Sequence, residues 1–308
     1  MTAITATAPG KIILFGEHAV VYGRPAIAAP VSQVQARVVI QANPRGALGQ
    51  VLLQAPDIGL ESALDALSAD HPLASAIRGV CSELSLKRLP ACTVRITSTI
   101  PVAAGMGSGA AVSVALIRAL GGFLGHPLPP ERISALAFEV EKLHHGTPSG
   151  IDNSVVTHAM PVYFTRGRPI EKLRLPVPFT VVIGDTGIAS PTAVSVGDVR
   201  LAWQAEPARY EDIFDAMGRI AERARELIET GQPQGLGPLM DENHAYLQEI
   251  GVSSVELDRL VQAARQAGAL GAKLSGGGRG GNMIALAAPE IAKTLRRHCL
   301  PTAQGGRS

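Results

Sequence analysis

The stretch PVAAGMGSGAAVS, positions 101–113, contains three glycines and few bulky side chains. It follows CTVRITS at 92–98, whose alternation of polar and apolar residues predicts a strand. It runs into AAVSVALIRALGGFL at 110–124, which is small and apolar nearly all round and predicts a helix buried on most sides. A strand, a glycine loop and a helix start in this order present free backbone N–H groups to an anion. Taken alone, the stretch fits a phosphate-binding loop and a tight helix–sheet contact equally well.

Spacing excludes two common phosphate loops. Gly105, Gly107 and Gly109 lack the final spacing of the dinucleotide fingerprint, and no Lys-Ser/Thr pair follows to make a P-loop. A helix N-terminus contributes only about 0.3–1 kcal/mol to the binding of an anion, whereas micromolar affinity needs about 8 kcal/mol. A nucleotide site therefore needs a metal ion, a lysine, or both, from elsewhere in the chain.

Three other stretches supply candidates. APGKIILFGEHAVVYGRPA at 8–26 and EKLHHGTPSGIDNSV at 141–155 place charged side chains beside short apolar runs and glycines. KLSGGGRGGNMIAL at 273–286 is a second glycine cluster between two predicted strands. The candidate residues in the first two stretches are Lys11, Glu17, His18, Glu141 near a helix end and Asp152 in a loop.

Composition limits the class of protein. Of 308 residues, 46% are hydrophobic and 18% charged, enough for a substantial core in one large domain or two smaller ones. The net charge is only +2, aromatic residues make up 4% and basic residues are scattered, so nothing indicates nucleic-acid binding. The N-terminus has no signal-peptide pattern, and the most apolar stretch is shorter than the ~20 residues of a membrane span. We expect a cytoplasmic protein with no membrane partner and with its three cysteines reduced.

The order of predicted elements favours an α+β architecture in two domains. A Pro-rich and charged stretch, TRGRPIEKLRLPVP at 165–178, suggests a boundary between a domain at 1–170 and a domain at 171–308. Helices are predicted at about 61–86, at 129–146 and, several of them, between 191 and 267, and a loop is predicted after 146. The predicted strands besides 92–98 are 11–15, 34–40, 50–55, 179–185, 271–275 and 282–287.

Together these stretches resemble the GHMP small-molecule kinases, and most closely the branch that phosphorylates mevalonate. APGKIILFGEHAVV and HGTPSGIDN are specific to that branch, and the glycine loops are shared by the superfamily. The resemblance implies a ribosomal-S5-like N-terminal domain and a ferredoxin-like C-terminal domain, with the active site in the cleft between them. It implies transfer of the γ-phosphoryl of ATP, with Mg²⁺, to the primary hydroxyl of mevalonate. The products are 5-phosphomevalonate and ADP, in the mevalonate pathway to isoprenoids and lipids.

The resemblance also implies roles for individual residues. Asp152 matches the base that accepts the hydroxyl proton, and Lys11 matches a lysine near the transferred phosphoryl group. Glu141 matches a Mg²⁺ ligand, with Ser108 or a water completing the metal shell. Substrate contacts are implied for Glu17, His18 and Thr192. The implied ATP-binding residues are Ala103, Ala104, Gly105, Met106, Gly107, Ser108, Gly109, Ala110 and Ala111.

The chain departs from the family pattern at two positions. Family members often read GLGSSAA in the phosphate loop, and this chain has Gly109 at the second serine. Arg279 splits the second glycine cluster, where it either reaches a phosphate or a carboxylate bidentately or points into solvent. Ser108 has the alternative role of a helix N-cap.

Three alternative functions stay open from the sequence. The first is another GHMP kinase, such as a phosphomevalonate, mevalonate 3-phosphate-forming or homoserine kinase, against which GEHAVV and HGTPSGID count. The second is a nucleotide-binding sensor without catalysis, and the third is a decarboxylase of the same superfamily. The family resemblance suggests a homodimer.

Overall fold

The computed structural model describes residues 3–101, 105–145, 148–190, 192–292 and 295. The chain forms two compact units. Unit 1 comprises Met1–Lys11, Pro30–Pro101 and Gly107–Met160, and unit 2 comprises Ile12–Ala29, Val102–Met106 and Pro161–Ser308. Two long strands, β1 (Ala3–Phe15) and β2 (Ala26–Ala42), have residues in both units. Because the chain passes between the units more than once, residues close in sequence belong to different units.

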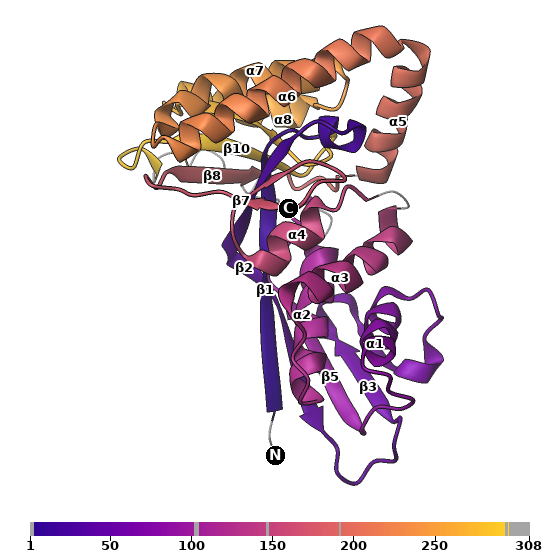
Figure 1. Cartoon of the computed structure of the whole chain (residues 1–308). Helices are drawn as coiled ribbons and strands as arrows, with labels where there is room; N and C mark the ends of the chain where they lie inside the picture. Colours follow the sequence, from indigo (N-terminus) through magenta and orange to yellow (C-terminus); the bar gives the residue numbers. More distant parts are fainter. Residues whose placement is uncertain (1–2, 102–104, 146–147, 191, 293–294, 296–308) are drawn as a thin grey trace, which may run out of the picture. The chain divides into compact units, whose positions relative to one another are not determined.

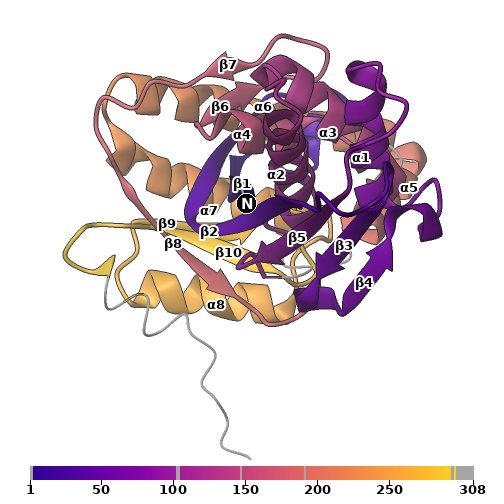
Figure 2. The ribbon, with the colours of Figure 1, turned by 90° about the horizontal axis from the view of Figure 1, so that it is seen from below.

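Unit 1 contains a mixed sheet. Strands β4 (Leu60–Ala63), β3 (Val51–Ala55) and β5 (Cys92–Ser98) pair in that order, and β5 pairs with the second half of β2. The β3–β5 pair is parallel and the others are antiparallel. Figure 2 shows β3, β4 and β5 side by side, with helix α1 (Pro72–Glu83) beside them. Alternate residues of β5 are buried, as its sequence pattern predicted.

Helix α2 (Ser108–Phe123) is at the centre of unit 1. It packs against α1, α3 (Pro130–His145) and α4 (Ile151–His158), and it also contacts β5. Most of its residues are buried, and they are mainly Ala, Val, Leu and Ile. The prediction of a helix buried on most sides is therefore confirmed. Small side chains allow three helices to approach α2 closely, and this fixes where its N-terminus lies.

Unit 2 contains a three-stranded antiparallel sheet in the order β8 (Thr180–Asp185), β10 (Asn282–Ala287), β9 (Gly271–Ser275). Helices α7 (Leu236–Glu249) and α8 (Val255–Gln266) pack against this sheet, and α6 (Pro207–Glu229) packs against α7 (Figure 1). Helix α5 (Thr192–Ala205) contacts α6. The first residues of β2 pair with β6 (Val162–Phe164), which pairs with β7 (Glu171–Lys172).

Four short 3₁₀ helices complete the described elements, and none of the helices in the described part of the chain is long and apolar enough to cross a membrane. The first of them, η1 (Ala19–Tyr22), contacts α6. The other three are η2 (Pro56–Ile58), η3 (Leu64–Ala66) and η4 (Pro233–Gly235).

Two sequence predictions are wrong. The stretch at 61–86 is not helical throughout, because Leu60–Ala63 pairs with β3 and only Pro72–Glu83 forms an α-helix. Pairing with a neighbouring strand here overrides the weak helix propensity of an alanine-rich segment. The stretch around Asp152 is not a loop, because Gly150 takes a positive φ of 90° and begins helix α4 at Ile151. Asp152 consequently lies in the first turn of a helix.

Candidate active site

In unit 1, Lys11 and Asp152 form an ion pair. Lys11 Nζ lies 3.1 Å from Asp152 Oδ1. The lysine side chain is 5% exposed and the aspartate side chain 28% exposed, so water reaches one carboxylate and hardly reaches the ammonium group. The structure thus pairs the two residues that the sequence proposed as catalytic, from strand β1 and helix α4.

Glu141, near the C-terminal end of α3, is close enough to both members of this pair to interact electrostatically. The pKa of Glu141 is raised from 4.5 to about 7, mainly by burial and in smaller part by the negative charge of Asp152, while Lys11 acts in the opposite direction. A cation bound at the oxygens of such a carboxyl group would favour its ionised form. Among the described residues, no group of three or more His, Cys, Asp or Glu side chains is arranged to hold a metal ion.

The glycine loop that leads into α2 lies against Lys11 and Glu141. Gly105 and Gly107 have positive φ values of 76° and 69°, a backbone conformation that favours glycine. A Cβ atom on Gly107 would lie 2.8 Å from Cγ of Lys11, and one on Gly109 would lie 3.3 Å from Oε1 of Glu141. Helix α2 begins at Ser108 with Gly107 as its N-cap, so the N-cap role considered for Ser108 is wrong. The first N–H groups of α2 thus begin beside a lysine and two carboxylates.

We expect Gly107→Ala to lower kcat/KM at least about tenfold, because its methyl group would displace Lys11. Gly59→Ala is the matched control in the same unit, since Gly59 has a similar positive φ of 64° and no described atom within 4 Å of an added Cβ. Both variants should lose about 1 kcal/mol of stability from the unfavourable φ. Steady-state kinetics and urea unfolding of both variants measure the two effects. Equal activity of the two variants would contradict the role assigned to Gly107.

In unit 2, Glu17 is fully buried in an ion pair with Lys273 of β9. Asn243 Nδ2 of α7 also donates to Glu17 Oε2 at 3.3 Å, and Lys273 donates to the carbonyl oxygen of Leu274 at 2.7 Å. Burial lowers the pKa of Lys273, and the charge of Glu17 opposes this shift. Lys273 is a site residue that the sequence analysis did not single out. Its signal was a lone lysine in the otherwise small and apolar strand GAKLS.

The second glycine cluster brings together two of the proposed substrate contacts. His18 Nε2 lies 3.1 Å from the carbonyl oxygen of Gly277, and a Cβ atom on Gly277 would lie 2.7 Å from Thr192 Oγ1. Only glycine fits between these residues. At the following residue of the cluster, the carbonyl oxygen of Gly278 accepts a hydrogen bond from Ser190 Oγ at 2.8 Å.

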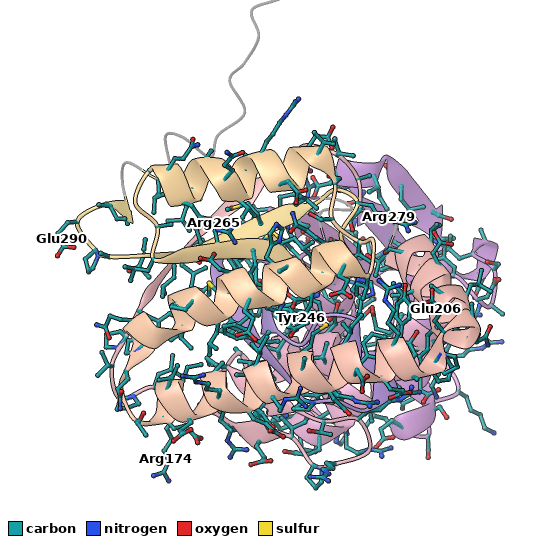
Figure 3. The ribbon with its side chains drawn as sticks, turned by 90° about the horizontal axis from the view of Figure 1, so that it is seen from above. Arg174, Glu206, Tyr246, Arg265, Arg279 and Glu290 are labelled. Atoms are coloured by element: carbon teal, nitrogen blue, oxygen red, sulfur yellow. The ribbon has the colours of Figure 1, made fainter. Side chains whose placement is uncertain are left out.

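Arg279 forms an ion pair with Asp198 of α5 and, through Nε, donates to the carbonyl oxygen of Gly251 at 3.4 Å. Figure 3 shows it at the β9–β10 loop. The guanidinium therefore reaches a carboxylate of its own unit, which is one of the two alternatives that the sequence left open.

The predicted site residues thus fall into two groups. Lys11, Glu141, Asp152, Gly107 and Gly109 gather in unit 1. Glu17, His18 and Thr192 gather around β9 and the second glycine cluster in unit 2. Gly105 and Met106 belong to unit 2, where an added Cβ on Gly276 would lie 3.5 Å from the carbonyl oxygen of Gly105. Ala103 and Ala104 lie outside the described residues.

Comparison with known proteins shows the class to which this fold and these residues belong. The family GHMP kinases N terminal domain matches residues 72–159, and the family GHMP kinases C terminal matches residues 224–300. The mevalonate kinase of Pyrococcus horikoshii is 39% identical over 305 residues, which are 92% of this chain and 88% of that protein. The chain belongs to the GHMP kinase family, in its mevalonate kinase branch.

Two solved structures are similar over almost the whole chain. The mevalonate kinase of Methanococcus jannaschii has a TM-score of 0.83 and 25% identity, covering 96% of this chain and 94% of that one. The mevalonate kinase of L. major in complex with R-mevalonate has a TM-score of 0.80 and 32% identity, covering 98% and 93%. The predicted two-domain GHMP kinase fold of the α+β class is confirmed.

Proposed function

We propose that this protein transfers the γ-phosphoryl group of ATP to the primary hydroxyl of mevalonate, giving 5-phosphomevalonate and ADP. A bond forms between the hydroxyl oxygen and the γ-phosphorus, and the bond from that phosphorus to the β–γ bridging oxygen breaks. The hydroxyl proton passes to Asp152. The observation that carries the proposal is the ion pair between Lys11 and Asp152, two residues of motifs specific to this branch of the family.

Asp152 has the geometry of a base whose orientation is fixed. Its Oδ1 is held by Lys11, and the 28% exposure of the side chain leaves the carboxylate accessible to a substrate hydroxyl. A positioned base contributes about 10²- to 10⁴-fold to the rate of a proton transfer. Lys11 has a second role, because its nearly buried ammonium group stabilises negative charge that develops on the transferred phosphoryl group.

The oxygen donors beside this pair fit Mg²⁺. Glu141 is a buried carboxylate with a raised pKa, Asp152 is its neighbour, and the hydroxyl-bearing Ser108 begins α2. Mg²⁺ prefers one or two carboxylates together with substrate phosphates and waters, so this set is sufficient. Bound there, the ion would neutralise charge on the phosphate oxygens. We propose Glu141 as its principal protein ligand, with Ser108 as a second candidate.

The N-terminus of α2 is proposed as the binding site for the phosphates of ATP. Its first N–H groups have no partner within the helix, and the helix dipole favours an anion there. Gly105, Gly107 and Gly109 carry no side chain that would block the approach of a phosphate to this backbone. Residues 103–111 are therefore retained as the proposed phosphate loop.

Unit 2 is proposed to supply substrate contacts through His18 and Thr192. Glu17 is fully buried against Lys273, so we propose that it contributes by holding His18 in place. We further propose a cytoplasmic location, where ATP is available, and a homodimer, as the family resemblance suggests.

A coupled assay of ADP release separates the alternative functions. The protein should release ADP with mevalonate and ATP at least about 100-fold more efficiently than with 5-phosphomevalonate or homoserine. We expect this preference because the motifs GEHAVV and HGTPSGID are specific to the branch that phosphorylates mevalonate. Mass spectrometry and NMR of the product should find the phosphate on the primary carbon and no released carbon dioxide. A preference for a phosphorylated alcohol would instead indicate a phosphomevalonate kinase. Binding of ATP and mevalonate without ADP release would indicate a sensor.

A further inference from the structure

Arg118 is the one charged residue of helix α2. Its neighbours Ile117 and Ala119 are fully buried, whereas Arg118 itself is partly exposed. Burial lowers the pKa of the guanidinium, and no described carboxylate opposes this shift. An arginine nevertheless stays charged at neutral pH. A half-buried charge without an acidic partner is unfavourable, so other contacts of the guanidinium must compensate for it.

The guanidinium binds two main-chain carbonyl groups. Nη1 donates to the carbonyl oxygen of Thr7 at 3.0 Å, and Nη2 donates to the carbonyl oxygen of Thr157. Thr7 belongs to strand β1 and Thr157 to the last turn of helix α4. The last carbonyl groups of a helix have no partner within the helix, and a cation there interacts favourably with the helix dipole. Arg118 therefore joins β1 to α4, and both contacts lie within unit 1.

The two elements that Arg118 joins are those that carry the ion pair of the candidate active site. Lys11 lies four residues after Thr7 on β1, about 13 Å along the strand. Asp152 lies five residues before Thr157 on α4, about 7.5 Å along the helix. The strand and the helix are thus linked at two separated points. One link would leave them free to turn about it, whereas two links fix the angle between them.

Helix α4 is short, so its contacts set its orientation. It spans Ile151–His158, and an isolated helix of fewer than about 12 residues is marginal in water. In its first turn, Asn153 Nδ2 donates to the carbonyl oxygen of Ser134 in α3 at 3.1 Å and to the hydroxyl of the same serine at 2.8 Å. Arg118 holds the last turn. Asn153 therefore anchors the end of the helix next to Asp152, and Arg118 fixes the direction of the helix from that anchor.

We propose that Arg118 is a positioning residue for the pair formed by Lys11 and Asp152, an inference that rests on the function proposed above. By fixing β1 and α4 against each other, it keeps Asp152 Oδ1 at 3.1 Å from Lys11 Nζ, in the orientation in which the carboxylate accepts the hydroxyl proton. Arg118 acts through the main chain of both elements and does not contact the reacting atoms. Catalysis is sensitive to such positioning, because a displacement of about 1 Å can cost about 10²-fold in rate.

A double-mutant cycle in kcat separates positioning of the base from general stabilisation. Arg118→Met keeps much of the side-chain volume and removes both hydrogen bonds. In the wild-type background it should lower kcat about 5- to 20-fold, with KM for ATP within about threefold of wild type. In the Asp152→Asn background the same substitution should lower kcat less than about twofold, because no base remains to be positioned. Assays with radiolabelled ATP measure the low rates of the double variant.

Arg118→Lys tests the requirement for two contacts. Lysine keeps the positive charge but lacks the planar fork that reaches two carbonyl groups at once. This variant should lower kcat at least about threefold, and only while Asp152 is present. If Arg118→Met does not fold, Arg118→Lys takes its place in the cycle.

Two control variants in unit 1 measure what a structural loss alone does. Arg132→Met removes an exposed arginine of α3 that pairs with Glu83, and Val80→Ala leaves a cavity at a fully buried position of α1. Both should keep kcat within about twofold of wild type, although Val80→Ala should unfold at a lower urea concentration. An equal loss of kcat on substitution of Arg118 in the two backgrounds would overturn the proposal. Failure of the wild-type protein to phosphorylate mevalonate at all would instead contradict the proposed function.

Discussion

Replacing Asp152 with asparagine is expected to lower kcat about 10²- to 10⁴-fold, which corresponds to about 3–5 kcal/mol in the activation barrier. The amide has nearly the same shape as the carboxylate and can stay near Lys11, but it cannot accept the proton of the substrate hydroxyl. KM for mevalonate and for ATP should change little, because the lost interaction develops in the transition state. Steady-state kinetics with varied mevalonate and varied ATP measure these quantities.

Asp65→Asn is the matched control for this experiment. Asp65 is an exposed aspartate of the same unit, in η3, and its substitution should leave kcat within about twofold of wild type. Lys11 loses its ionised partner in Asp152→Asn, so the variant should also be less stable by about 1–3 kcal/mol. Activity of Asp152→Asn within tenfold of wild type would remove the assignment of Asp152 as the base.

Lys273→Met is expected to lower the free energy of unfolding by about 3–5 kcal/mol. Methionine fills much of the same volume, so the main loss is the charge that compensates Glu17 inside the protein. Both side chains are 0% exposed, and Asn243 is the further described hydrogen-bond donor to the Glu17 carboxylate. Urea unfolding followed by circular dichroism measures the change in stability.

Two further variants make this prediction specific. Arg209→Met removes a cation of the same unit whose ion pairs are exposed, and it should change stability by less than about 1 kcal/mol. The double substitution Glu17→Met with Lys273→Met removes both buried charges and should recover most of the lost stability. A loss below 1 kcal/mol in Lys273→Met, or a double variant less stable than the single one, would show that the buried pair does not act as described.

Local sequence signals predicted several helices and strands correctly. The alternation in CTVRITS identified β5 at Cys92–Ser98, and the bounds of β9 and β10 were also predicted correctly. The helix predicted at 129–146 is α3, Pro130–His145. Predictions failed where pairing with a neighbouring strand decided the structure, as in β4, or where one glycine dihedral angle restarted a helix, as at Gly150. The periodicity of apolar residues describes one segment at a time. It does not report strand pairing or the dihedral angle of a single glycine.

The candidate site was predictable as a set of residues and not as an arrangement. Lys11, Glu141 and Asp152 were identified from motifs, but a motif does not show that burial raises the pKa of Glu141 to about 7. Lys273 was missed because a lysine in a short strand ordinarily indicates an exposed position. Its pairing with Glu17 joins residues 256 positions apart.

The sequence by itself determined the family, the composition of the core and the two glycine clusters, because these depend on residue identity and short-range spacing. The tertiary structure alone decided which charges meet. Lys11 faces Asp152, Lys273 faces Glu17 and Arg279 faces Asp198, and each pair joins segments that are distant in sequence. The contact of His18 Nε2 with the carbonyl oxygen of Gly277 likewise joins residues that are distant in sequence. Coulomb and hydrogen-bond energies depend on distance in space, which the fold sets and the order of residues does not.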